Sequence, residues 1–189
     1  MPPRFRAPLL IAGSLALALA GCASPDPKLY TLSQVAGPVQ TKAPTRIEVR
    51  SVSIARYLDR PQVVRSTSNN QIAIGGNERW GDPLGSMVSR IVAENLGQRL
   101  PKAVVFNGDS ALSVTPNALV EIDIQRMDLD HSGSVVLAAQ IAVSRGNGTP
   151  AVKTVRYEVR PASTDTKDLV RAMSTALGQL SDAIVQMLG

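Results

Sequence analysis

The sequence predicts an α+β fold in which an antiparallel β-sheet carries two amphipathic helices on one face. Three stretches in the second half of the chain alternate apolar and polar residues, with short turns between them. Short turns join antiparallel neighbours, and clean alternation is typical of a sheet with one face in water. Two other stretches repeat apolar residues at helical spacing. Together these patterns favour a two-layer domain.

The first elements that we expect are short strands between proline-containing breaks. Residues 28–32 are the first candidate, and residues 45–56 are the second. In the second, the alternation changes phase near Ser51, which predicts a bulge or a bend. Residues 61–67 and 71–75 contain β-branched residues on either side of a Ser-Asn-Asn turn, and they predict a hairpin.

A first helix is expected to begin at Asp82-Pro83, with Asp82 as its cap, and to end before Pro101. A last helix is expected over residues 166–188, with Asp165 as its cap. The apolar stripe of the first helix consists of Leu84, Met87, Val88, Ile91, Val92, Leu96 and Leu100. The stripe of the last helix consists of Leu169, Met173, Ala176, Leu177, Leu180, Ile184 and Leu188.

Four more strands are expected between these helices. A short one covers Ala103–Phe106, and longer ones cover residues 118–127, 135–144 and 152–160. Apolar side chains alternate with charged or polar ones along the first and the last of the three long strands, so these should have one buried and one wet face.

The N-terminus has the pattern of a secretory signal. Arg4 and Arg6 precede an apolar run that ends at Leu19-Ala20-Gly21-Cys22. The run is shorter than the roughly 20 apolar residues of a transmembrane helix. A cysteine directly after small residues resembles a bacterial lipobox, in which the cysteine becomes the lipid-bearing N-terminus. We therefore expect Cys22 to carry acyl chains that hold the protein on a membrane.

This pattern divides the chain into three parts. Residues 1–21 are the expected signal peptide, residues 22–44 are a lipidated N-terminus and tether with one short strand, and residues 45–189 are a single α+β domain. Ala23 follows the cysteine, where an aspartate would be the inner-membrane retention signal familiar from enterobacteria. The expected location is the periplasmic face of the outer membrane.

Composition argues against nucleic-acid binding and against catalysis. The formal net charge of +5 falls by two when Arg4 and Arg6 leave, and no Lys/Arg-rich cluster builds a nucleic-acid footprint. His131 is the only histidine and Cys22 the only cysteine, so a zinc or copper site is not expected. Asp128 and Asp130 are expected at a solvated rim. We find no paired nucleophile and base, and predict a protein without cofactor that is not an enzyme.

Two stretches are more distinctive than the rest, namely Tyr57–Arg65 and Glu78–Leu84. A structural interpretation is a turn and strand followed by a helix entry. In that interpretation Asp59 and Arg60 pair locally, and Trp80 fills the junction of sheet and helix.

The order of these motifs resembles one family. A lipobox, Tyr30-Thr31-Leu32, then Tyr57-Leu58-Asp59-Arg60-Pro61-Gln62-Val63-Val64, and then Arg79-Trp80 with Pro83-Leu84 is similar to the PqiC-like, ABC-type transport auxiliary lipoproteins. The resemblance implies an outer-membrane-side partner of an ABC transporter (permease and ATPase) and of periplasmic MCE-domain proteins that move phospholipid or other hydrophobic cargo.

On this resemblance, the expected role is a docking or binding module. The surface that we expect to meet the MCE protein contains Tyr57, Asp59, Arg60, Pro61, Arg79 and Trp80. A related version has the domain hold a phospholipid between sheet and helices, and a homo-oligomer around the conduit is a further option. The alternatives are a structural lipoprotein that stabilises an outer-membrane complex and, with less support, a lipid-anchored hydrolase.

Overall fold

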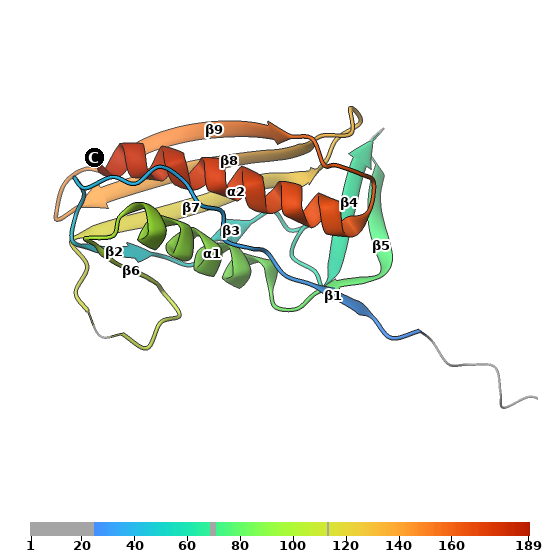
Figure 1. Cartoon of the computed structure of the whole chain (residues 1–189), viewed down its shortest axis with the longest axis horizontal. Coiled ribbons are helices and arrows are strands. Elements are labelled where there is room, and N and C mark those ends of the chain that lie inside the picture. The colour runs from blue at the N-terminus through green and yellow to red at the C-terminus, as the bar shows by residue number, and fades with distance from the viewer. Residues whose placement is uncertain (1–24, 69–70, 113) are drawn as a thin grey trace, which may run out of the picture.

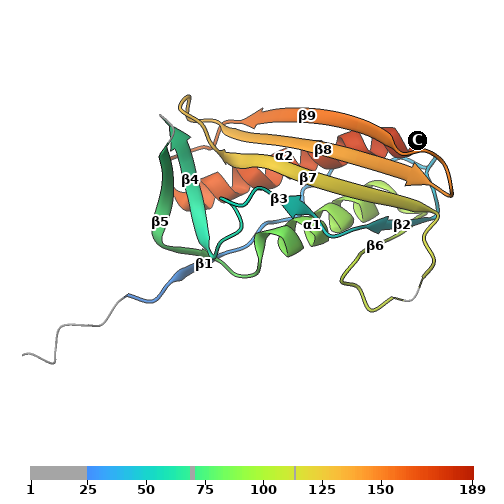
Figure 2. The same ribbon diagram turned by 180° about the vertical axis from the view of Figure 1, so that it is seen from behind.

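Two helices lie side by side over the same face of a nine-stranded sheet (Figure 1). Figure 2 shows the sheet from its other side, with both helices behind it. The computed structural model describes residues 25–68, 71–112 and 114–189. The strands are β1 (Lys28–Tyr30), β2 (Arg46–Val49), β3 (Ser53–Ile54), β4 (Gln62–Ser68), β5 (Gln71–Trp80), β6 (Val104–Asn107), β7 (Ala118–Leu129), β8 (Val135–Arg145) and β9 (Ala151–Val159); the helices are α1 (Leu84–Arg99) and α2 (Thr166–Leu188).

Strand β7 organises the sheet because it has partners along both of its edges. On one edge it pairs with β8 over its whole length, and β8 in turn pairs with β9. On the other edge it pairs successively with β2, β3 and β4. Strand β6 lies outside β2, β5 lies outside β4, and β1 lies outside β5. The β4–β5 hairpin stands steeply to the long strands at one end of the molecule (Figure 1).

The α+β class with both helices on one face is confirmed, but the expected all-antiparallel sheet is wrong. Only β4–β5, β7–β8 and β8–β9 are antiparallel, and these are the pairs joined by short connections. The pairs β1–β5, β2–β6, β2–β7, β3–β7 and β4–β7 are parallel. Parallel neighbours need a connection that crosses back over the sheet, and α1 lies within one such connection between β2 and β6.

The predicted bend near Ser51 separates β2 from β3. The chain continues to follow β7 through the break, since the Arg50 amide donates to the Val120 carbonyl at 3.0 Å. The Ala55 amide donates to the Ile124 carbonyl at 2.9 Å. The change of phase in the sequence therefore marks a break in the strand that pairs with β7, and the chain keeps the same partner on both sides of the break.

The apolar stripes of both helices form the core as predicted, since every residue of the two stripes is buried. The predicted cap of α1 is wrong, and the predicted cap of α2 is confirmed in position but not in its side-chain bond. The residue before α1 is Pro83 and not Asp82, and no side chain caps that helix. Asp165 does precede α2, but its side chain makes no capping bond; its carbonyl accepts the amides of Asp168 and Leu169 instead.

The chain between β1 and β2 is packed against the helices. We call residues 33–40 the strap. Its backbone amides donate to side chains of both helices: Ser33 to Ser174 Oγ at 3.1 Å, Val35 to Asn95 Oδ1 at 2.8 Å, and Gly37 to Gln98 Oε1 at 2.9 Å. In Figure 1 the strap runs along the helical layer as the blue coil. Much of the predicted tether therefore lies on the domain.

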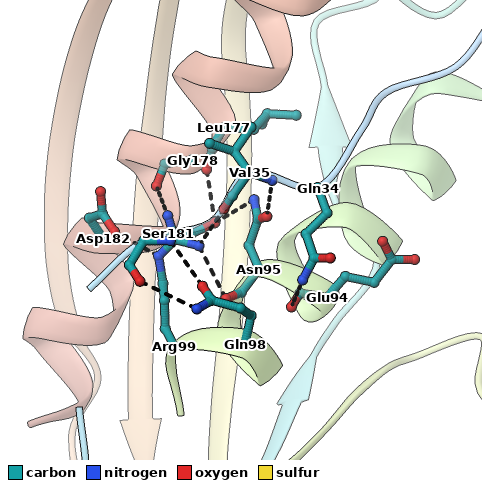
Figure 3. A network of polar contacts seen from close by, with 11 residues as sticks. Gln34, Val35, Glu94, Asn95, Gln98, Arg99, Leu177, Gly178, Ser181 and Asp182 are labelled. Atoms are coloured by element: carbon teal, nitrogen blue, oxygen red, sulfur yellow. Dashed lines mark hydrogen bonds and ion pairs between the residues drawn. The ribbon is translucent and has the colours of Figure 1, made fainter. Parts of the chain in front are cut away.

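Arg99 of α1 is the largest polar side chain in the interior, with an exposed fraction of 1%. Its guanidinium joins α1, α2 and the strap (Figure 3). It donates to Asp182 Oδ1 at 2.6 Å, to the Val35 carbonyl at 2.8 Å and to the Gly178 carbonyl at 3.2 Å. Because a buried cation needs a charge partner and several acceptors, this position is fixed by the contacts of three segments.

Candidate docking site at the start of helix α1

The two distinctive stretches of the sequence lie beside each other in the fold. Gln62 of β4 is the register partner of Arg79 of β5, and the Trp80 amide donates to the Pro61 carbonyl at 2.8 Å. The hairpin therefore places the residues before β4 next to those that lead from β5 into α1.

A pocket of about 370 Å³ lies between these stretches. Asp59, Arg60, Pro61 and Trp80 line it, together with the residues that enter α1, Gly81, Asp82, Pro83 and Leu84. A second hollow of about 270 Å³, lined in part by Gly85, Ser86 and Ser89 of α1, shares Asp59 and Pro83 with the first. Both hollows border the start of α1.

Arg60 provides unused hydrogen-bonding capacity in this pocket. Its Nε is buried and has no hydrogen-bond partner among the described residues. The expected local ion pair with Asp59 is absent from the described part of the chain, although Asp59 and Asp82 both line the pocket. All N–H groups of a guanidinium are donors, and they match a carboxylate in geometry. The buried Nε is not itself accessible to a ligand, so an acceptor group in the pocket would have to meet the terminal nitrogens of Arg60, with Asp59 and Asp82 in the same lining.

Trp80 and Tyr57 are held by the fold. Trp80 is only 6% exposed and belongs to the core, and it also lines the pocket. Tyr57 is half-buried, and its hydroxyl donates to Asp128 Oδ2 at 2.5 Å. Arg79 is also half-buried and does not line the pocket. Of the six predicted docking residues, the structure brings Asp59, Arg60, Pro61 and Trp80 together.

Asp128 lies in the interior and not at a solvated rim, which corrects the sequence-based expectation. Its exposed fraction is 0%, and its Oδ1 accepts from Arg126 at 2.9 Å. Burial, and then the hydrogen bond to Asp128 and its charge, raise the pKa of Tyr57 above its usual range, while the Arg126 charge opposes this in part. The Tyr57–Asp128–Arg126 group thus fixes the segment that presents Asp59 and Arg60.

The other end of the first stretch is also structural. Val63 and Val64 are buried. Arg65 donates to Glu78 Oε2 at 3.1 Å and to Thr166 Oγ1 at 2.7 Å, and so ties the hairpin to the start of α2. Within Tyr57–Arg65, the reachable surface is therefore the turn of Asp59, Arg60 and Pro61.

The expected lipidation residue, Cys22, lies outside the described residues. His131 is exposed in the turn between β7 and β8. Within the described ranges, no group of three or more His, Cys, Asp or Glu side chains is placed to hold a metal ion. A search of the same residues finds no helix long and apolar enough to cross a membrane.

Some members of the site were not predicted from the sequence. Gly81, Asp82 and Pro83 were assigned only to the helix entry, although they form one wall of the pocket. The predicted hairpin could have indicated their place, because a hairpin brings the residues after β5 next to the residues before β4. The partnership of Tyr57 with Asp128, 71 positions apart, has no signal in either local pattern.

Comparison with known proteins decides the family. The model of the ABC-type transport auxiliary lipoprotein component matches residues 30–185. The chain belongs to this family. Its expected membership is confirmed, and this family is a transport auxiliary class and not an enzyme class. A search of curated proteins finds no match.

Solved structures share the fold of this family member. One, titled as an uncharacterized protein, has a TM-score of 0.73 and 19% identity, and the match covers 87% of this chain and 100% of that one. A Xanthomonas campestris protein of the family DUF330 has a TM-score of 0.69 and 17% identity, with coverage of 84% and 92%. A PelC dodecamer from Paraburkholderia phytofirmans reaches a TM-score of only 0.41 at 13% identity, with coverage of 80% and 98%.

Proposed function

We propose that the protein is a lipid-anchored docking module on the periplasmic face of the outer membrane, within an ABC/MCE-type system for intermembrane lipid transport. The family match over residues 30–185 is the observation that carries the transport role. The anchor is Cys22, and the partner is a periplasmic MCE-domain protein that connects to the permease and ATPase. Phospholipid is the proposed cargo.

The surface that we assign to the MCE protein is the pocket at the start of α1. Arg60 is its proposed recognition residue because it lines the pocket and its guanidinium has no ion pair among the described residues. An acceptor from a partner, such as a side-chain carboxylate or a C-terminus, would gain a charge-assisted bond there. Arginine is among the residues that most often dominate interface energetics.

Binding of a periplasmic MCE-domain protein from the same organism tests the assignment. We expect Arg60→Glu to weaken binding at least about tenfold, because it places a third negative charge in the pocket. The matched control is Arg156→Glu, an exposed charge reversal on β9 at the opposite edge of the sheet. Equal affinities of the two variants, each with a wild-type circular dichroism spectrum, would remove the pocket from the interface.

The alternatives make different demands on the chain. A structural lipoprotein would stabilise an outer-membrane complex and would leave binding of an MCE protein unaffected by Arg60. A lipid held between sheet and helices would have to displace side chains of the packed core, such as Leu96, Ile124 and Leu177. Native mass spectrometry of the purified protein would detect a phospholipid bound in this way. The same spectrum reports whether the chain forms a homo-oligomer.

A further inference from the structure

The start of the described chain is fixed to one edge of the sheet. The side-chain amide of Asn77 in β5 donates to the carbonyls of Pro25 and Asp26, at 2.7 Å in each case. Strand β1 then pairs with β5 in parallel, with Lys28 opposite Glu78. Figure 1 shows β1 beside the C-terminal end of β5, from which the chain continues into α1. The chain therefore enters the domain along the outer edge of β5.

This attachment limits how far the domain can lie from its anchor. Cys22 precedes Pro25 by three residues. A fully extended chain spans at most about 3.3–3.6 Å per residue, so the two Cα atoms are separated by no more than about 11 Å. Once Cys22 is acylated, the membrane surface must be within reach of the β1–β5 edge.

Three large exposed apolar side chains lie on these same two strands, at two places: Leu29 is opposite Arg79, and Ile72 and Ile74 lie five to seven residues earlier along β5. Leu29 of β1 is 67% exposed, and Ile72 and Ile74 of β5 are 45% and 43% exposed. The other large exposed apolar side chains of the described residues are spread over four further segments, at Val39, Val104, Leu112 and Val152. We call Leu29, Ile72 and Ile74 the β1–β5 apolar surface.

The charges near this surface suit a lipid interface. Lys28 is exposed next to Leu29, and a basic residue is attracted to anionic head groups. Glu78 is paired with Arg65, and the exposed acids on this side of β1 are Asp26 at the attachment point and Asp82 after β5. Because the anchor already holds this edge at the bilayer, the local concentration of lipid is high and even a weak apolar contact is populated.

We propose that the β1–β5 apolar surface rests on the lipid head-group region, so that the domain is docked on the membrane in one orientation and does not swing on a free tether. This inference rests on the proposed acylation of Cys22. In this proposal, Leu29, Ile72 and Ile74 contact the lipid surface.

The lone cysteine makes a direct test available. In the full-length acylated protein Cys22 is blocked, so Ile74→Cys provides a single free thiol for the environment-sensitive dye NBD. The labelled protein is placed on vesicles of phosphatidylethanolamine and phosphatidylglycerol, with and without spin-labelled lipid. Val152→Cys, at the opposite edge of the sheet and 68% exposed, is the matched control.

We expect the spin-labelled lipid to quench NBD at position 74 severalfold more than at position 152, and Leu29→Cys to behave like position 74. If the protein floats with the vesicles but positions 29, 74 and 152 are quenched equally, the proposed orientation is wrong and the anchoring stands. If the protein does not float with the vesicles, the anchoring and this inference both fail.

Discussion

Asp128 is a buried carboxylate whose partners come from two different segments. Arg126 neutralises its charge at 2.9 Å, and the Tyr57 hydroxyl donates to its second oxygen. Removing one partner from such a buried set of hydrogen bonds lowers stability, because the polar atoms that remain are then without both that partner and solvent water. The turn that carries Asp59 and Arg60 follows Tyr57 directly, so this group stabilises the geometry of the pocket.

We predict that Tyr57→Phe lowers the free energy of unfolding by about 1–3 kcal/mol, because the buried Asp128 carboxylate loses a hydrogen-bond donor. Urea denaturation measures the difference. The control is Tyr157→Phe. It removes the hydroxyl of another partly buried tyrosine, one that makes no hydrogen bond among the described residues, and it should change the free energy by less than about 0.5 kcal/mol. Similar losses in both variants would contradict the assigned role of the Tyr57 hydroxyl.

The same hydroxyl should give the stability a dependence on alkaline pH. The folded-state pKa of Tyr57 is raised, first by burial and then by Asp128. Its favourable contribution is therefore complete below the unfolded-state pKa of about 10 and is lost as the pH rises toward the folded-state pKa. We expect stability to fall between pH 9 and 11 more steeply in the wild type than in Tyr57→Phe. Tyr157 titrates in both proteins, so its effect cancels in the comparison.

At the scale of elements, the strap joins the two helices that cover the sheet. It is an irregular segment, yet its amides find acceptors on Ser174, Asn95 and Gln98. Gly37 is required where the strap passes Arg99, since a Cβ there would lie 2.3 Å from the guanidinium. That guanidinium cannot move away without losing its bonds to Asp182 and to the strap itself.

We therefore predict that Gly37→Ala destabilises the protein by about 1–3 kcal/mol, as expected for overpacking at a buried contact. Gly97→Ala is the matched control. It lies within α1 with open space around its Cα, so alanine should stabilise the helix by up to about 1 kcal/mol. Thermal or urea unfolding gives both values. A neutral Gly37→Ala would mean that the strap is not held against Arg99 in solution.

Strand β7 shows how a local irregularity changes which residues are buried. Its pairing with β8 shifts register between Ile124 and Arg126. Before this bulge the core residues are Ile122 and Ile124, and after it the core residue is Met127. The bulge leaves Asp128 on the face opposite Met127, where the Tyr57 segment covers it. The spacing from Ile124 to Met127 was the visible signal of this bulge.

For the whole molecule, the proposed anchor at Cys22, the pocket and the apolar surface would be linked through one end of the sheet. The β1–β5 edge receives the chain from Cys22, and the Gly81 amide donates to the Tyr30 carbonyl at 2.9 Å beside the pocket. A partner at the start of α1 would thus be held near the membrane. This arrangement suits a module that receives the end of a lipid conduit.

We predict that Cys22→Ser abolishes stable membrane association, because stable anchoring depends on acyl chains and the apolar surface alone is too small. Flotation of bacterial membranes and incorporation of labelled palmitate measure this. The secreted Cys22→Ser protein should retain the wild-type unfolding midpoint, since the cysteine lies before the described domain. Full membrane association of this variant would overturn the anchoring model.

The sequence by itself determined the features that depend on near neighbours. The helical stripes, the order of nearly all the strands and the hairpin follow from periodicity and turn residues, and the motif order identified the family. Tertiary structure alone decided the parallel pairing, the burial of Asp128 and the path of the strap. These depend on contacts such as Tyr57–Asp128 and Val35–Arg99, between residues more than 60 positions apart, and local patterns do not encode which distant segment supplies a partner.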